Sequence, residues 1–400
     1  MTDLTLLSPD GALRRTPLTG ASEYTRPTGP LRSRVAYAAA HVVPKTHADN
    51  TPGRPAEIDW DATLAFRRGV YSWGLGVADA MDTAQRNMGL DAAATRELIS
   101  RSAAVAREEG GSVVVGVNTD HIEAERITLA EVIDAYKSQL HFTEEQGAGP
   151  VLMASRHLAR AAGGAEDYRR VYREVLAAAT TPVVLHWLGT AFDPQLQGYF
   201  GADDWPTASG VLLEIIRENP DKVAGVKMSL LDADSEVAVR ERLPEGVRMF
   251  TGDDFNYVGL IGGADVPAAR QPQRDLRATR QHSDALLGAF AAITPVASAA
   301  IQALDAGDPA RYLEILEPTE ELSRQVFAAP TFYYKAGVAF LAWLNGYQPA
   351  FQMVGGLHSA RSLPHLSRIV DLANTAKALE RPDLAAERWH GMLRLNGVDA

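Results

Sequence analysis

The sequence predicts a (β/α)8 barrel followed by a helical C-terminal extension. The first observation is that eight short apolar segments alternate with segments of helical period between residues 33 and 294. This alternation is typical of parallel strands joined by helical crossovers, and eight such units close into a barrel. The second observation is that residues 295–400 show helical patterning only, so they cannot add strands. Residues 1–32, rich in Pro, Thr, Gly and Arg without a clear period, are expected to form an N-terminal arm.

Each predicted strand is a short apolar run with polar residues, Gly or Pro at its ends. The first run ends at Pro44 and the fifth begins at Pro182, where a missing N–H is tolerated. The last run is the least distinct, because its Ala and Leu residues also suit a helix. The strands are predicted at residues 35–43, 74–81, 112–117, 150–155, 182–188, 223–228, 248–251 and 285–292.

The segments between the strands carry apolar residues at helical spacing. A doubly wound open sheet is the alternative architecture, and it is disfavoured because no Gly-rich phosphate turn follows the first strand. Residues 264–282, rich in Arg, Pro and Gln, are expected to form an exposed loop. Helices are predicted at residues 58–73, 91–108, 128–146, 166–179, 207–218 and 234–242.

Composition excludes several classes of function. The 400 residues are 46% hydrophobic and 22% charged, an ordinary globular balance, with a formal net charge of −11. Without a basic block, non-specific binding to nucleic acid is not expected. The absence of cysteine excludes disulfides, thiolate zinc sites, iron–sulfur clusters and Cys nucleophiles. With no signal peptide and no apolar span of membrane length, a cytoplasmic protein without a membrane partner is expected.

Lys227 is the leading candidate for chemistry, because functional side chains of such barrels lie at the carboxyl ends of the strands. It interrupts an apolar run, residues 223–229, that otherwise reads as a buried strand. Burial lowers the pKa of an ammonium group and favours the neutral amine that attacks carbonyl carbon. The alternative is a structural ion pair with Asp82, Asp253 or Asp254.

Other polar residues follow the remaining predicted strands. His186 ends an apolar strand and is either a packing residue or a catalytic or ligand-binding one. Asp253 and Asp254 suit a turn cap, a general base or metal ligands, and residues 118–121 could hold a divalent cation with His186. No metal motif of diagnostic spacing is present. The other candidates at strand ends are Asp79, Asp82, Asn118, Asp120, Ser155, Arg156, His157, Trp187 and Ser229.

The order of several short motifs between Val35 and Gly346 resembles the dihydrodipicolinate synthase and N-acetylneuraminate lyase superfamily of Schiff-base barrels. More narrowly, it resembles a branch of that superfamily known only as a domain of unknown function. The resemblance implies that Lys227 forms the imine, that no cofactor is needed, and that the protein is a homo-oligomer, a dimer or a tetramer. The matching segments are residues 58–61, 223–227, 250–254 and 334–337, together with Phe327 and Pro330.

Two departures from this family concern the substrate. The Thr pair that holds a 2-keto acid carboxylate in the family is replaced by residues 78–82, whose two Asp side chains repel an acid. The tyrosine that relays protons after the fourth strand is replaced by residues 155–157, so His157 or His186 is expected to move protons instead. Arg156 could still bind an acidic group elsewhere.

The resulting hypothesis is a class I aldolase or lyase, or a dehydratase using the same imine, acting on a small hydroxylated carbonyl compound derived from a sugar. Lys227 forms the imine, and His186 moves protons with Asp82 or Asp254. The alternatives are a divalent-metal sugar isomerase or epimerase, and a non-catalytic barrel that binds carbohydrate. The expected substrate-binding residues are Asp79, Asn118, Asp120, Ser155, Arg156, His157, Trp187, Ser229 and Asp253.

Overall fold

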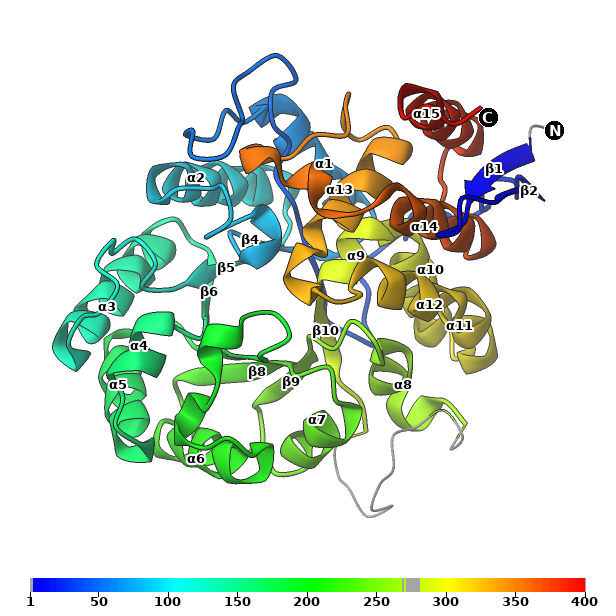
Figure 1. Ribbon diagram of the computed structural model, residues 1–400. Coiled ribbons are helices and arrows are strands. Elements are labelled where there is room, and N and C mark those ends of the chain that lie inside the picture. Colours follow the sequence, from blue (N-terminus) through cyan, green and yellow to red (C-terminus); the bar gives the residue numbers. More distant parts are fainter. Residues whose placement is uncertain (1–2, 268–269, 271–280, 400) are drawn as a thin grey trace.

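Eight parallel strands close into a barrel, and helices surround it (Figure 1). The computed structural model describes residues 3–267, 270 and 281–399. The strand order around the barrel is β10-β3-β4-β5-β6-β7-β8-β9, so each strand pairs with its sequence neighbours and the last closes onto the first. The predicted fold class is therefore confirmed. The barrel strands are β3 (Ala36–Ala39), β4 (Gly76–Asp79), β5 (Val113–Val117), β6 (Gly149–Leu152), β7 (Val183–Leu188), β8 (Val223–Ser229), β9 (Arg248–Thr251) and β10 (Asp284–Leu287).

The barrel has two apolar layers because successive side chains of a strand point to opposite faces. One layer fills the interior, and the other packs between the strands and the helices. In β7, for example, Val184 belongs to the interior cluster, whereas Val183 and Leu185 belong to the outer one. This alternation decides which polar residues can enter the barrel. The interior cluster contains Ala39, Ala78, Met81, Val114, Val151, Met153, Val184, Phe250 and Leu286.

Most of the barrel helices, α1–α4, α6 and α7, begin at side-chain caps that satisfy free backbone N–H groups. Asp59 caps α1 by accepting from Ala62 N, and Thr128 and Glu131 form a reciprocal capping box on α3. These signals match the sequence-predicted helix starts to within three residues. The helices of the barrel are α1 (Trp60–Ser72), α2 (Ala92–Glu109), α3 (Leu129–Glu145), α4 (Arg156–Ala161), α5 (Ala165–Ala178), α6 (Trp205–Glu218), α7 (Ala233–Arg240), α8 (Tyr257–Gly262) and α9 (Gly288–Ala292).

The last barrel strand is shorter than the sequence predicts. A strand was expected over residues 285–292, but β10 ends at Leu287 and the chain turns into α9. Gly288 begins that helix in a crowded place, because a Cβ there would lie 2.9 Å from Phe327 Cζ and 3.0 Å from Tyr334 Cε2. The Ala residues that follow Gly288 favour a helix, so the rest of the segment is helical. Most of the loop predicted over residues 264–282 lies outside the described residues.

The C-terminal extension is helical and packs on one side of the barrel (Figure 1). Its α13 contacts α9, so it covers the barrel beside the last strand. Short 3-10 turns accompany these helices, among them η6 (Thr331–Tyr333) directly before α13. The extension consists of α10 (Thr294–Asp305), α11 (Pro309–Leu316), α12 (Pro318–Val326), α13 (Lys335–Leu344), α14 (Leu363–Thr375) and α15 (Pro382–Leu395).

The N-terminal arm carries a β-hairpin that its composition did not reveal. Strands β1 (Asp3–Leu7) and β2 (Leu13–Pro17) pair antiparallel and lie beside α14 and α15. Trp389 Nε1 donates to Thr5 O at 2.7 Å, and Thr5 N donates to His390 Nε2 at 3.0 Å. Leu4 is completely buried. The apolar side of one short hairpin is thus covered by helices nearly 400 residues later in the chain.

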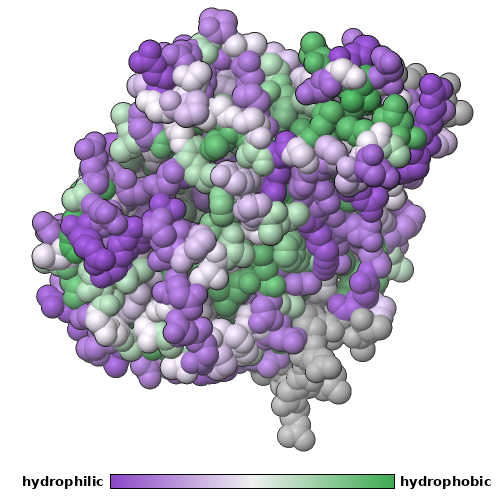
Figure 2. Space-filling model, in the orientation of Figure 1, coloured by the Kyte–Doolittle hydropathy of each residue, from purple (hydrophilic) through white to green (hydrophobic). Residues whose placement is uncertain are grey.

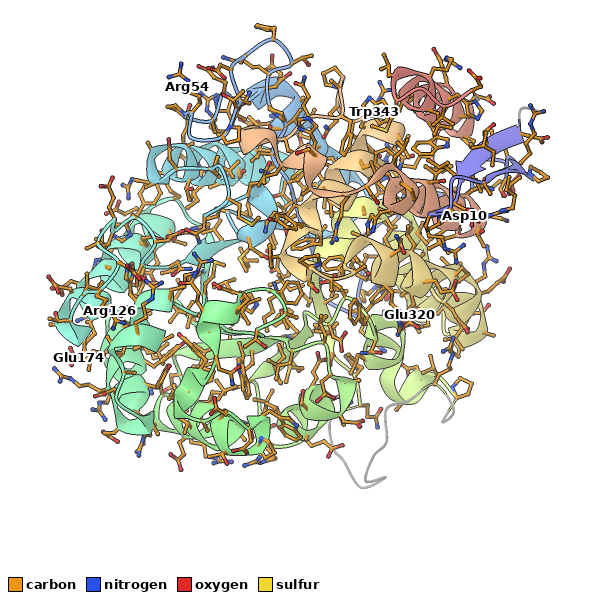
Figure 3. All side chains as sticks on the ribbon, in the orientation of Figure 1. Asp10, Arg54, Arg126, Glu174, Glu320 and Trp343 are labelled. Atoms are coloured by element: carbon orange, nitrogen blue, oxygen red, sulfur yellow. The ribbon has the colours of Figure 1, made fainter. Side chains whose placement is uncertain are left out.

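The face shown in Figure 2 carries both polar and apolar residues. Figure 2 shows hydrophilic residues around the rim of this face, with apolar ones toward its centre and beside the C-terminal helices. Charged residues such as Arg126 and Glu174 lie at the outer edge of the helical ring (Figure 3). No helix of the described chain combines the length and the apolar character that crossing a bilayer requires.

Candidate active site

Lys227 lies on β8 with its side chain in the barrel interior. It pairs in register with His186 on β7 and Phe250 on β9, and its neighbours Val226 and Met228 belong to the outer cluster. Only 6% of Lys227 is exposed. Space for its side chain comes from Gly252, where a Cβ would lie 2.9 Å from Lys227 Cε.

The Lys227 amine is buried without a direct partner. Within the described residues its Nζ forms neither a hydrogen bond nor an ion pair. Burial lowers the pKa of Lys227, and the more distant carboxyl groups of Asp82 and Asp254 oppose that shift without cancelling it. This environment favours a larger fraction of neutral, nucleophilic amine than an exposed lysine has.

Asp254 is the carboxyl group on the β9 side of Lys227. It follows β9, and its Oδ1 accepts from Ala289 N at 2.9 Å. Burial raises the pKa of Asp254 to about 8, since the single backbone hydrogen bond and the charge of Lys227 only partly offset it. Asp254 therefore holds a proton at neutral pH that it can give to a reacting group.

Asp82 is the second carboxyl group, and it connects to a tyrosine from the C-terminal extension. Tyr334 donates to Asp82 Oδ2 at 3.0 Å, and its hydroxyl also hydrogen-bonds Thr83 Oγ1. The Tyr334 ring stacks on Phe327 with centroids 4.3 Å apart and planes 12° apart. Burial, reinforced by the Asp82 charge, raises the pKa of Tyr334 well above its usual range, so the hydroxyl keeps its proton. A phenolic group thus lies at the site although the sequence lacks the family tyrosine after the fourth strand.

His186 lies beside Lys227 on the neighbouring strand and has no access to solvent. It is completely buried, and its Nε2 lies 3.1 Å from Ser229 Oγ. Its Nδ1 has no hydrogen-bond partner among the described residues. Burial and the nearby Lys227 lower the pKa of His186 well below its ordinary value, so the ring is neutral. The role of His186 in proton transfer stays a prediction; in this structure its ring lies beside Lys227 and hydrogen-bonds Ser229.

A cavity of about 310 Å³ opens beside this cluster at the carboxyl ends of β4–β7. Asp82 belongs both to its wall and to the surroundings of Lys227, so it connects the two. Lys227, His186 and Asp254 are not among the residues that line this cavity. The predicted substrate-binding residues that line the cavity are Asn118, Asp120, Arg156 and His157.

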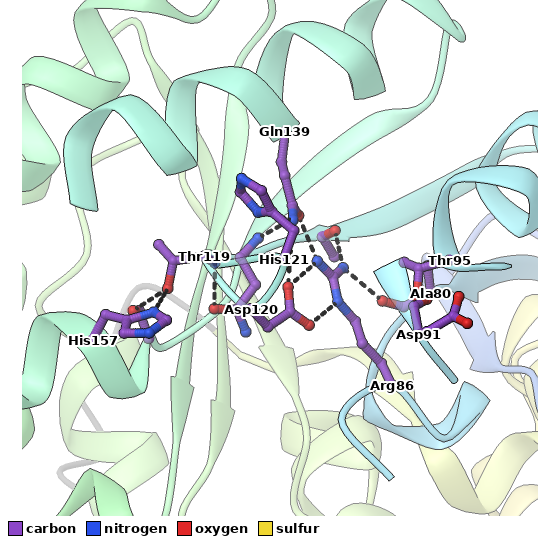
Figure 4. A network of polar contacts seen from close by, with 12 residues as sticks. Ala80, Arg86, Asp91, Thr95, Thr119, Asp120, His121, Gln139 and His157 are labelled. Atoms are coloured by element: carbon purple, nitrogen blue, oxygen red, sulfur yellow. Dashed lines mark hydrogen bonds and ion pairs between the residues drawn. The ribbon is translucent and has the colours of Figure 1, made fainter. Parts of the chain in front are cut away.

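One part of the cavity wall is a chain of hydrogen-bonded side chains (Figure 4). Thr119 Oγ1 lies 2.6 Å from Ser155 Oγ and 2.8 Å from His157 Nδ1. His157 Nε2 donates to Ala124 O at 2.8 Å, which leaves Nδ1 as the acceptor from Thr119. Ser155 is the cap of α4 and accepts from Leu158 N, so it supports the wall instead of meeting a substrate.

Another part of the wall is a buried ion pair. Arg86 Nε and Nη2 each contact one oxygen of Asp120 at 2.6 Å (Figure 4). Burial alone would raise the pKa of Asp120, but the Arg86 guanidinium outweighs it and holds the pKa below its usual range. Gln139 joins the same network. Asp120 is thus an ionised carboxylate that is already paired. In the chain as described, no three His, Asp or Glu side chains are grouped to hold a metal ion.

Comparisons with known proteins agree with this architecture. Residues 4–398 match the family described as Protein of unknown function (DUF993). The chain belongs to this family. A search among curated proteins finds no match.

Solved structures similar to this DUF993 protein include several dihydrodipicolinate synthases. The enzyme from Oceanobacillus iheyensis is 13% identical with a TM-score of 0.60, covering 86% of this chain and 97% of its own. The enzyme from Aquifex aeolicus is 12% identical with a TM-score of 0.58, covering 92% and 99%. That from Cyanidioschyzon merolae is 14% identical with a TM-score of 0.61, covering 87% and 99%. The resemblance predicted from the sequence is therefore confirmed at the level of the fold.

Three predicted site residues of the DUF993 chain serve the scaffold instead. The Asp79 carboxylate accepts from Arg67 Nε and Nη2, both at 2.7 Å, between the barrel and α1. Trp187 packs outward against Phe200, with ring centroids 5.4 Å apart. Both point away from the interior because of strand alternation. Asp253 closes a turn by accepting from the backbone N–H groups of Phe255 and Asn256.

Strand-end reasoning missed the contribution of helices to the site. Tyr334 and Lys335 come from the start of α13, and Asp193 comes from the loop after β7. Lys335 is a second buried lysine of the DUF993 protein, and its Nζ lies 4.0 Å from Asp82 Oδ2. A signal for Tyr334 and Lys335 existed, because they begin one of the segments that carry the family resemblance. The sequence pattern does not indicate that this segment reaches the mouth of the barrel.

Proposed function

We propose that this protein is a class I aldolase or lyase in which Lys227 forms an imine with a small hydroxylated carbonyl compound. The observation that carries the proposal is a buried amine in the barrel interior, free of direct partners among the described residues. A buried ammonium kept only for stability is normally paired. The fold shared with dihydrodipicolinate synthases supports the same chemistry.

The first step forms a carbon–nitrogen bond. The lone pair of Lys227 Nζ attacks the substrate carbonyl carbon, and the carbonyl oxygen takes up a proton as the amine loses one. Protonation of the resulting hydroxyl releases water and leaves the cationic imine. Asp254, with its pKa near 8, is suited to give that proton.

In the second step the imine accepts the electron pair of a breaking bond beside it. That bond is C–C in an aldolase, or C–H with later loss of a β-hydroxyl in a dehydratase. Asp82 is suited to remove the substrate proton because its carboxylate faces the cavity, and Tyr334 and Thr83 can pass it on. His186 and Ser229 hold the shape of the barrel interior beside Lys227.

Borohydride reduction tests the imine. The protein is treated with borohydride and, in turn, with keto acids, keto sugars and aldoses, and adducts are located by peptide mass spectrometry. We expect covalent mass on Lys227 with at least one class and none in the Lys227→Ala variant. An adduct on Lys335 instead, or none together with an active Lys227→Ala, would refute the assignment.

The homo-oligomer and the cytoplasmic location expected from the sequence stay predictions. One similar structure is of a monomeric dihydrodipicolinate synthase variant, 13% identical to this chain. Sedimentation velocity of the purified protein distinguishes a monomer from a dimer or tetramer.

A further inference from the structure

We propose that Lys335 and Arg156 bind an acidic group of the substrate, a carboxylate or a phosphate, at the end remote from its carbonyl. This inference rests on the proposed function for the position of the carbonyl, and it names the substrate class: sugar acids or sugar phosphates with a free aldehyde or ketone. The acid and the carbonyl would lie on opposite sides of Asp82.

Lys335 is a buried cation whose donors lack adequate partners. Its side chain is 4% exposed, and it lines the cavity. Asp82 Oδ2, at 4.0 Å, is beyond hydrogen-bond distance, and the nearer contact is the weak acceptor Met88 Sδ at 3.5 Å. The Tyr334 ring, with its centroid 5.0 Å away, adds only a modest attraction. A buried ammonium is costly without hydrogen bonds, so its acceptors are expected to come from the cavity.

Arg156 offers the second half of the site. It is the first residue of α4, and Asp193 fixes its Nε at 2.6 Å. Its two terminal nitrogens make no hydrogen bond with other described residues, and they form the planar fork that suits a carboxylate or phosphate. Arg156 and Lys335 line the same cavity, and burial together with repulsion from the Arg156 charge lowers the pKa of Lys335, while Asp82 opposes that shift. An anion between them relieves that repulsion.

The other cations of the cavity wall are already engaged. Arg160 donates to Glu125 O at 2.8 Å and to Gln195, and Arg86 is bound by Asp120. Of the cationic donors that line the cavity, those of Lys335 and the Arg156 fork remain. A hydroxyl could satisfy one of them, whereas an oxyanion with several acceptor oxygens can satisfy many at once.

The test compares carbonyl compounds that differ only in the acid. One arm uses glyceraldehyde and glyceraldehyde 3-phosphate, and the other uses butanal and 4-oxobutanoate. The measured quantity is the concentration that gives half-maximal borohydride trapping on Lys227. We expect the acid of at least one arm to be preferred by about ten- to a hundredfold, as for charge-assisted hydrogen bonds. A preference in the glyceraldehyde arm indicates a phosphate site, and a preference in the butanal arm indicates a carboxylate site.

Variants assign the preference to the two side chains. Lys335→Met should abolish it, Arg156→Met should reduce it, and Lys335→Arg should retain part of it. Arg160→Met is the matched control, because that guanidinium lines the same cavity but is already bound. An equal loss in Arg160→Met, or no preference in the wild type, would overturn the proposal.

A second measurement separates this site from the imine. Inorganic phosphate and succinate are titrated by calorimetry into wild type, Lys227→Ala and Lys335→Met. We expect at least one anion to bind the first two proteins alike and Lys335→Met at least tenfold more weakly. Anion binding without trapping would refute the proposed function and leave the anion site standing. Trapping on Lys227 without anion binding or acid preference would support the proposed function and refute the anion site.

Discussion

The two sides of the barrel hold buried ionisable groups in opposite ways. Between β4 and the helices α1 and α2, Arg67 and Asp79 form a bidentate pair whose side chains are both 0% exposed. Around β8 and β9, Lys227 and Asp254 are also buried, but neither has a partner of opposite charge in direct contact within the described chain. The first arrangement secures the scaffold. The second costs stability, and we interpret that cost as the consequence of keeping reactive groups available.

The largest expected effect comes from breaking the paired side. Arg67→Met should lower the free energy of unfolding by about 3–5 kcal/mol, because it leaves the Asp79 charge buried alone. Lys227→Met, which removes an unpaired buried amine, should leave stability unchanged or raise it. Urea denaturation of both variants measures the difference. Equal losses would mean that Lys227 is structural and that the contrast between the two sides is false.

Removing the Tyr334 hydroxyl should slow chemistry with little effect on stability. Tyr334→Phe takes away the contacts to Asp82 and Thr83, so trapping on Lys227 should slow by about a hundredfold, the scale of general acid–base catalysis. Tyr312→Phe is the control, because its buried hydroxyl donates to Val258 O at 2.8 Å, outside the cluster around Lys227. Rapid-quench trapping rates for the two variants give the comparison, and similar rates would remove Tyr334 from the mechanism.

Filling the space beside Lys227 should have a smaller effect. In Gly252→Ala the new methyl group would begin 2.2 Å from Ser229 Oγ and 2.9 Å from Lys227 Cε, so both side chains must shift. We expect a loss of about 1–3 kcal/mol in stability and slower trapping. Gly210→Ala, in α6 with no atom within 4 Å of its Cβ, should be neutral or stabilising. Thermal unfolding measures the stability of both variants. Equal stabilities would argue against close packing at Gly252.

The last effect builds up gradually with pH and concerns a buried carboxyl group near the unpaired side. Burial raises the pKa of Glu236 from 4.5 to about 8, and its Oε1 accepts from Ser283 at 2.7 Å. A carboxyl group with a raised folded-state pKa stabilises fully below pH 4.5 and loses that contribution as pH rises through 8. Relative to Glu236→Gln, the wild type should therefore lose up to about 1.4 kcal/mol per pH unit across this window. Denaturation at a series of pH values measures it, and a constant difference would mean that Glu236 is ionised when folded.

Most of the barrel was predictable because each strand and helix carries its own local pattern. The strand over Arg248–Thr251 matches its prediction at both ends, and the caps at Asp59 and Thr128 mark helix starts. Prediction failed where a distant segment decides the outcome. The hairpin at β1 and β2 depends on α14 and α15, and the end of β10 depends on the crowding around Gly288.

The site was predictable to the extent that it lies on strands. Lys227 is conspicuous because a charge in an apolar run has few explanations, and its neighbours on adjacent strands follow from the topology. Asp79 and Trp187 were misassigned because one position along a strand reverses the face on which a side chain lies. Tyr334 and Lys335 were missed because their place at the barrel mouth depends on how the C-terminal helices fold back.

The bond between Thr5 and Trp389 joins positions 384 residues apart. During synthesis Leu4 leaves the ribosome long before the helix that covers it has been made, since domains emerge and fold from the N-terminus onward. The barrel can close around its interior before α15 has been made, but the hairpin cannot pack against α15 until then. Completion of this layer consequently waits until α15 has been synthesised, and nascent chains that lack α15 should leave this side of β1 uncovered.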